Sequence, residues 1–161
     1  DLLPPLLALD ARVVLGSASG TRTVPYESFV RGYRSVDVRP GELLVAVEVP
    51  QPRDGTVQHW RKVGTRAAQS IAKVSLAAAA RVEAGRVAGA RLAFGGVADR
   101  PVRLHGIEAM VDASPPGDAL AAAVERTVRA AVHPITDVRS TAAYRADVAG
   151  RLAARFVAGL G

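Results

Sequence analysis

The chain has 161 residues and a formal net charge of +6, and it contains no cysteine, one tryptophan and two lysines. This length allows one large domain or two small ones. The lack of cysteine excludes disulfides, iron–sulfur ligation and thiol nucleophiles within the chain, and it favours a cytoplasmic protein. The arginines are scattered and not interleaved with aromatic residues, so nucleic-acid binding is not expected. No apolar run approaches the ~20 residues of a membrane span.

The first element that we expect is a short helix over Pro4–Leu9. Asp1 is suited to cap it, and proline is favoured in a first helical turn. Leu2, Leu6 and Leu9 would then share one face. An apolar face on so short a helix requires a cover, and the sequence predicts that the cover lies before residue 1.

The next elements are expected to be short strands and a helical turn. Two strands joined by a loop of glycine, serine and alanine predict a hairpin. The aromatic residues of Tyr26–Tyr33 recur at helical spacing, which favours one or two helical turns. Leu43–Val49 contains leucine and valine with one charge, which predicts a strand buried on most of its surface. The two hairpin strands are Ala11–Leu15 and Thr21–Val24.

Two prolines and a glycine in Pro50–Gly55 mark a linker. The sequence therefore predicts two domains, residues 1–52 and residues 56–161. Alternating apolar residues in the second domain predict a three-stranded antiparallel meander with one apolar face. A sheet of this kind needs a covering layer. The three strands are Thr56–Val63, Ile71–Val82 and Val87–Val97.

Three helices after the meander are expected to form that layer. Asp118 and Ser140 are candidate N-caps for the second and third of them. Apolar residues four apart in the last helix, including Tyr144 and Phe156, are expected to face inward. The predicted fold class is therefore α+β. The three helices are Pro101–Val111, Ala119–Val132 and Thr141–Leu160.

The residues alone indicate little catalytic chemistry. The three histidines lack metal-ligand spacing, and they are expected to be structural. Gly95-Gly96 does not resemble a phosphate-binding loop. The most suggestive segment is the polar Gly64–Ser70, with Lys62 and Lys73 beside it, because two cations and free backbone amides could hold an anion or an electron-rich ring. The alternative is a solvated loop with charged ends.

Several strings resemble a known family along the whole chain. These strings are Asp1-Leu2-Leu3-Pro4, Pro40-Gly41-Glu42-Leu43-Leu44, Lys62-Val63-Gly64-Thr65-Arg66, Phe94-Gly95-Gly96-Val97-Ala98 and Asp137-Val138-Arg139-Ser140-Thr141-Ala142-Ala143-Tyr144-Arg145. Together they resemble the latter part of the FAD-binding medium subunit of the molybdenum hydroxylases, the group of xanthine dehydrogenase and carbon monoxide dehydrogenase.

The resemblance implies a fold and a redox function. It implies the end of an FAD-binding α/β subdomain, followed by a small antiparallel sheet packed on about three helices. FAD would lie between a molybdopterin-binding large subunit and an acceptor. Electrons would arrive through the iron–sulfur clusters of a small subunit, and the flavin would pass them to NAD or another acceptor.

The resemblance also implies three FAD contacts. Asp1 matches an acidic residue that contacts FAD, Leu43 matches an apolar residue near the isoalloxazine, and Lys62 matches a lysine at the flavin. Val63–Lys73 matches a mobile loop on the acceptor side. Acidic residues of that loop in animal xanthine dehydrogenase are replaced here by Ala67–Ser70.

The family's glycine-rich FAD loops come earlier in its sequence and have no counterpart here. Backbone amides of such loops hold the pyrophosphate. We therefore expect this chain alone to bind FAD poorly or not at all and to be inactive. The alternative function is a non-catalytic docking module on the same fold.

Overall fold

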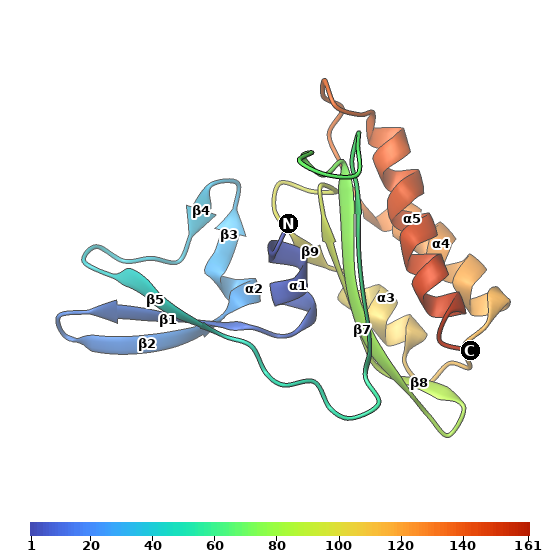
Figure 1. The fold of residues 1–161 in the computed structure, drawn as a ribbon, viewed down its shortest axis with the longest axis horizontal. Helices are drawn as coiled ribbons and strands as arrows, with labels where there is room; N and C mark the ends of the chain where they lie inside the picture. The colour runs from blue at the N-terminus through green and yellow to red at the C-terminus, as the bar shows by residue number, and fades with distance from the viewer.

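The computed structural model describes residues 1–161 and has two parts, a small sheet with short helices and a larger sheet covered by three helices (Figure 1). The class is α+β with antiparallel sheets, as the sequence predicts. The first part consists of α1 (Leu3–Ala8), β1 (Arg12–Ser17), β2 (Gly20–Pro25), α2 (Tyr26–Phe29), β3 (Val30–Gly32), β4 (Ser35–Val36) and β5 (Leu43–Glu48).

The second part is a four-stranded antiparallel sheet in the order β6-β7-β8-β9, followed by three helices. The predicted three-strand meander is present, and the two-residue β9 adds a fourth strand beside β8. The elements are β6 (Val57–Val63), β7 (Val74–Glu83), β8 (Arg86–Gly95), β9 (Val102–Arg103), α3 (His105–Val111), α4 (Asp118–Ala131) and α5 (Ala142–Ala158).

The main core lies between the β6–β9 sheet and helices α3, α4 and α5. It contains 21 buried residues. Fully buried members include Leu76, Leu92 and Phe94 of the sheet and Val124 and Val128 of α4. The predicted helical layer is therefore confirmed. None of the helices combines the length and the apolar character that a membrane-spanning helix requires.

The prediction that only one face of the meander is apolar is wrong, because helix α1 covers the other face (Figure 1). Ala77 of β7 and Ala93 of β8 point to this face and pack in a cluster with Leu7 and Ala8 of α1. Methyl side chains on the sheet let the short helix approach closely. The apolar face of α1 is thus covered from within the chain. That face contains Leu7 and Ala8, whereas Leu2 is 73% exposed.

Strand β5 contradicts the prediction of a mostly buried strand. All six of its residues are exposed, and Leu43 is 74% exposed. The reason is topological: β5 pairs only with β1, at the edge of a three-stranded sheet. A run of leucine and valine predicts a strand, but it does not show whether another layer covers that strand.

The expected helix caps are also wrong. Leu2 and Gly117 occupy the N-cap positions of α1 and α4 and make no side-chain cap bond. Thr141, not Ser140, caps α5 through a 3.2 Å hydrogen bond from the Tyr144 N–H. Asp118 is the first residue of α4, where its charge favours the positive end of the helix.

Three predicted boundaries shift because other contacts compete. Helix α2 ends at Phe29, since Val30 pairs with Val36 in the β3–β4 hairpin. Residues 71–73 precede β7 instead of belonging to it. Helix α3 begins at His105, since Val102 and Arg103 pair with β8. Along α5 the buried face is rotated from the predicted one, and Tyr144 is 43% exposed.

Candidate cofactor site

Lys62, at the end of β6, joins the two parts of the chain. Its Nζ lies 2.5 Å from Oδ2 of Asp1 and donates a 3.0 Å hydrogen bond to the Ser70 carbonyl oxygen. The Lys62 side chain is 18% exposed and the Asp1 side chain 48% exposed. The structure thus brings together two of the three predicted FAD contacts, and the Asp1 carboxylate is the more exposed of the two groups.

The loop between Val63 and Val74 folds back on itself. The Lys73 N–H donates a 2.7 Å bond to the Val63 carbonyl and closes the base of the loop. Within it, the Arg66 guanidinium donates to the Ala68 and Gln69 carbonyls, and the Ser70 hydroxyl donates to the Arg66 carbonyl. Arg66, the fixed cation of the loop, is therefore used to organise its backbone.

A cleft of about 540 Å³ lies beside the Asp1–Lys62 pair. Asp1 and Leu3 line one side, and Ser70 and Ile71 of the loop line another. Leu3 and Ile71 are 45% and 64% exposed. The cleft therefore offers a carboxylate, backbone groups and apolar side chains. A second hollow, of about 430 Å³, contains Trp60, Lys62 and Arg66.

Gly95 and Gly96 form part of the cleft wall, and their lack of side chains is required there. A Cβ on Gly95 would press on the Ser75 hydroxyl and on Pro4 of α1. Gly96 has φ of +79°, and a Cβ there would collide with the Lys73 carbonyl oxygen. The pair thus allows α1 and the loop to pack closely against the end of β8.

Leu43, the third predicted contact, is not brought to this cleft. It pairs with Gly16, at the end of β1 that lies away from α1. It lines neither the cleft beside Asp1 nor the hollow beside Trp60. Figure 1 shows β5 in the small sheet, which extends away from β6 and β7.

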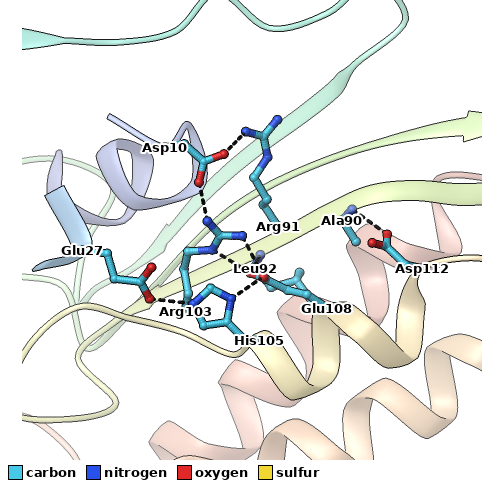
Figure 2. Close-up of polar contacts among 9 residues, drawn as sticks. All are labelled: Asp10, Glu27, Ala90, Arg91, Leu92, Arg103, His105, Glu108 and Asp112. Atoms are coloured by element: carbon cyan, nitrogen blue, oxygen red, sulfur yellow. Dashed lines mark hydrogen bonds and ion pairs between the residues drawn. The ribbon is translucent and has the colours of Figure 1, made fainter. Parts of the chain in front are cut away.

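A larger hollow, of about 590 Å³, lies where the linker and helix α1 meet strand β8 and helix α3, and its charged groups mostly pair with one another. Figure 2 shows Asp10 between Arg91 and Arg103. Glu108, with a side chain only 7% exposed, accepts from Arg103 and from the Leu92 N–H. This network ties the end of α1 to the second part of the chain.

His105 also belongs to this network and is structural, as predicted. Nε2 lies 2.7 Å from Glu27 and Nδ1 lies 3.0 Å from Glu108 (Figure 2). The hydrogen bond to Glu27 raises the pKa of His105 above its usual value. No group of three or more His, Asp and Glu side chains is arranged to hold a metal ion.

Two family models match the chain. One, described as the CO dehydrogenase flavoprotein C-terminal domain, matches residues 59–160, and the other, the FAD binding domain in molybdopterin dehydrogenase, matches residues 1–52. This chain belongs to the FAD-binding medium subunits of the molybdenum hydroxylase family. The resemblance of its sequence motifs to that family is therefore confirmed.

Relatives of this family match almost the whole chain. The chain is 34% identical over 148 residues to the glyceraldehyde dehydrogenase medium chain of Sulfolobus acidocaldarius, covering 92% of this chain and 52% of the relative. It is 30% identical over 146 residues to a putative xanthine dehydrogenase FAD-binding subunit of Escherichia coli, covering 90% and 50%. The chain thus spans about half the length of these relatives.

Solved structures of the family share the fold. A carbon monoxide dehydrogenase from Hydrogenophaga pseudoflava superposes with a TM-score of 0.92 at 26% identity, covering 99% of this chain and 56% of that one. Quinoline 2-oxidoreductase from Pseudomonas putida 86 superposes with a TM-score of 0.86 at 24% identity, covering 98% and 54%. The second likeness shows the fold alone.

Proposed function

We propose that this chain supplies part of an FAD site in a molybdenum hydroxylase, and that the subunit passes electrons from iron–sulfur clusters through FAD to NAD or another acceptor. The supporting observation is the Asp1–Lys62 pair at the edge of an open cleft, in a chain that both family models match. The partners proposed are a molybdopterin-binding large subunit and an iron–sulfur small subunit. A cytoplasmic location is part of the same proposal.

The residues at the cleft fit one rim of a flavin site. The Asp1 carboxylate, 48% exposed, is available to accept hydrogen bonds from ribityl or ribose hydroxyls. Lys62 would lie near the ring, where a cation stabilises the negative charge of its reduced form. FAD, when bound, supplies a ring that takes up and releases electrons. Leu3 and Ile71 offer apolar surface beside these groups.

Leu43 is proposed as a contact from the other edge of the site. Its side chain is 74% exposed and so is accessible for such a contact. We further propose that residues 1–52 and 56–161 are separate domains, with the FAD site between them. The 161 residues contain no glycine-rich pyrophosphate loop, so we expect them to bind FAD poorly by themselves.

A second function is favoured by strand β5. Its six exposed residues, mostly leucine and valine, form an uncovered edge. Exposed apolar strand edges are sites where other chains add strands. The alternative is therefore a docking module that holds no flavin.

The visible absorption spectrum of the full-length natural protein, purified with and without added FAD, separates the two functions. A bound-flavin spectrum is the expected result. A colourless protein that does not retain FAD would contradict the proposal and favour the docking module. The same measurement on residues 1–161 alone should give little or no bound flavin.

A further inference from the structure

Arg145, in α5, is a buried arginine, and its guanidinium contacts the C-terminal end of the loop between Val63 and Val74. It is 5% exposed. Nη1 donates to the carbonyl oxygen of Lys73 and, at 3.3 Å, to that of Gly96. The contact with Lys73 is made at the point where the loop enters β7. A buried side chain on a long helix therefore fixes the end of this loop.

Asp137 sets the direction of this arginine. Its Oδ1 accepts a 2.8 Å bond from Nη2 of Arg145, together with backbone N–H bonds from Arg139 and Ser140. The carboxylate thus organises its own turn and orients the guanidinium at the same time. Planar guanidinium groups suit such forked contacts, because their donors have fixed directions.

The neighbouring residues of the same motif support this arrangement. Thr141 caps α5, which fixes the first turn of the helix and so the position of Arg145. The ammonium of Lys73 lies 5.3 Å from the centre of the Tyr144 ring, a cation–π contact. Gly96 leaves room for the Lys73 carbonyl that Arg145 holds. The string from Asp137 to Arg145 thus contacts the end of the loop at Lys73, through Tyr144 and Arg145 of α5.

The loop in turn holds Lys62. The Ser70 carbonyl, three residues before Lys73, accepts the hydrogen bond of the Lys62 ammonium. The Lys73 N–H donates a hydrogen bond to the carbonyl oxygen of Val63, the residue after Lys62. A shift of the Lys73 backbone would therefore move the Ser70 carbonyl, which accepts from Lys62, and Val63, which follows Lys62 in the chain.

We propose that Arg145 is a positioning residue, which holds the Lys73 carbonyl and thereby orients the loop between Val63 and Val74, whose Ser70 carbonyl in turn fixes the Lys62 ammonium against Asp1 at the cleft. Insofar as it concerns FAD, this inference rests on the proposed function. The structural part, that Arg145 orders the loop, stands without it.

The first test is amide hydrogen exchange of the loop in an Arg145→Lys variant. Lysine keeps the charge but has a single nitrogen in place of Nη1 and Nη2, so it cannot reproduce the forked contact with Lys73, Gly96 and Asp137. We expect exchange in residues 64–73 to rise about tenfold, while β7 and β8 change by no more than about twofold. Arg151→Lys is the matched control on the same helix, because Arg151 is 69% exposed and pairs only with Asp147.

Two results would overturn the inference. One is an unchanged loop in the Arg145→Lys variant, and the other is a uniform rise in exchange across the whole domain, which would indicate a merely structural role. Should Arg145→Lys fail to fold, Asp137→Asn provides the test, because it keeps an oxygen acceptor but weakens the orientation of Arg145. The loop should then show a smaller rise, again confined to residues 64–73.

The second test uses FAD bound to the full-length natural protein. Arg145→Lys should raise the dissociation constant for FAD about tenfold and change the visible circular dichroism of the flavin, while Arg151→Lys changes neither. A wild-type protein that binds no FAD would refute the proposed function, yet loop exchange would still decide the role of Arg145. Normal affinity and an unchanged flavin spectrum in Arg145→Lys would refute the coupling to Lys62.

Discussion

The Lys62 ammonium lies 2.5 Å from the Asp1 carboxylate, so a residue before the first helix is paired with a residue at the end of β6. The pair spans 61 positions of sequence and joins the two parts of the chain. Lys62 is the more buried partner, and Asp1 is the partner that faces the cleft. A ligand in the cleft would therefore meet a carboxylate whose position is set by a fixed cation.

Asp1→Asn tests the role of that carboxylate. The amide has the shape of the carboxylate but no charge. It is therefore a weaker acceptor for ligand hydroxyls and a weaker partner of Lys62. We expect the dissociation constant of the full-length protein for FAD to rise roughly tenfold, corresponding to the loss of about one charge-assisted hydrogen bond. Flavin fluorescence titration measures this. Asp54→Asn, in the exposed linker, is the control and should leave the affinity unchanged.

Glu108→Gln tests the network of Figure 2. The glutamate accepts from the Leu92 N–H at 2.8 Å and from two nitrogens of Arg103, and its side chain is 7% exposed. Removing its charge leaves a mostly buried arginine without full compensation, which should lower the free energy of unfolding by about 3 kcal/mol. Urea denaturation provides the measurement.

Glu125→Gln is the matched control for this prediction. Glu125 pairs with Arg129 on the surface of α4, where the expected loss is about 0.5 kcal/mol or less. An equal effect of the two substitutions would show that the Glu108 network contributes no more than a surface ion pair.

The His105–Glu27 contact should make stability depend on pH. The hydrogen bond to Glu27 raises the pKa of His105 in the folded state. The stabilisation of the folded state by this contact is therefore complete below the pKa of His105 in the unfolded chain, about 6.5. It is lost as pH rises through the higher pKa of the folded state. Melting temperatures of wild type and Glu27→Gln should differ most near pH ~5.5 and converge at alkaline pH. A difference that is constant from acid to alkaline pH would contradict this.

Ala77→Leu tests whether α1 covers the second face of the sheet. Ala77 is 4% exposed and packs in the cluster that contains Leu7 and Ala8. Added bulk should push α1 away and lower stability by about 1–3 kcal/mol. Thermal or urea unfolding measures the change, with Ala122→Leu on the exposed side of α4 as control. If Ala77→Leu is as stable as Ala122→Leu, α1 does not pack tightly on this face.

The periodic elements could be predicted from the sequence, because the larger sheet and the long helices follow simple burial patterns. Strands β7 and β8 and helices α4 and α5 lie within a few residues of their expected bounds. The exposure of β5 could not be predicted, since an apolar run has the same composition at an edge as in a core. Strand β9 is too short to have a pattern of its own.

The candidate site depends on pairs that are distant in sequence, and spacing does not reveal these. Glu27 and His105 are 78 positions apart and Asp1 and Lys62 are 61 apart. Asp1 and Lys62 were each predicted as FAD contacts because they match family motifs, but their contact with each other was not predicted. Arg145 lay within one such motif, but its contact with Lys73 emerged from the fold.

The most direct test of the account is the affinity and reduction potential of FAD in a Lys62→Met variant of the full-length protein. Arg61→Met is the matched control, because Arg61 precedes Lys62 on β6 and is exposed. We expect Lys62→Met to weaken FAD binding about tenfold and to make the flavin potential more negative, since a cation that stabilises the reduced ring is removed. Wild-type affinity and potential in Lys62→Met would contradict the proposal that this lysine lies at the flavin.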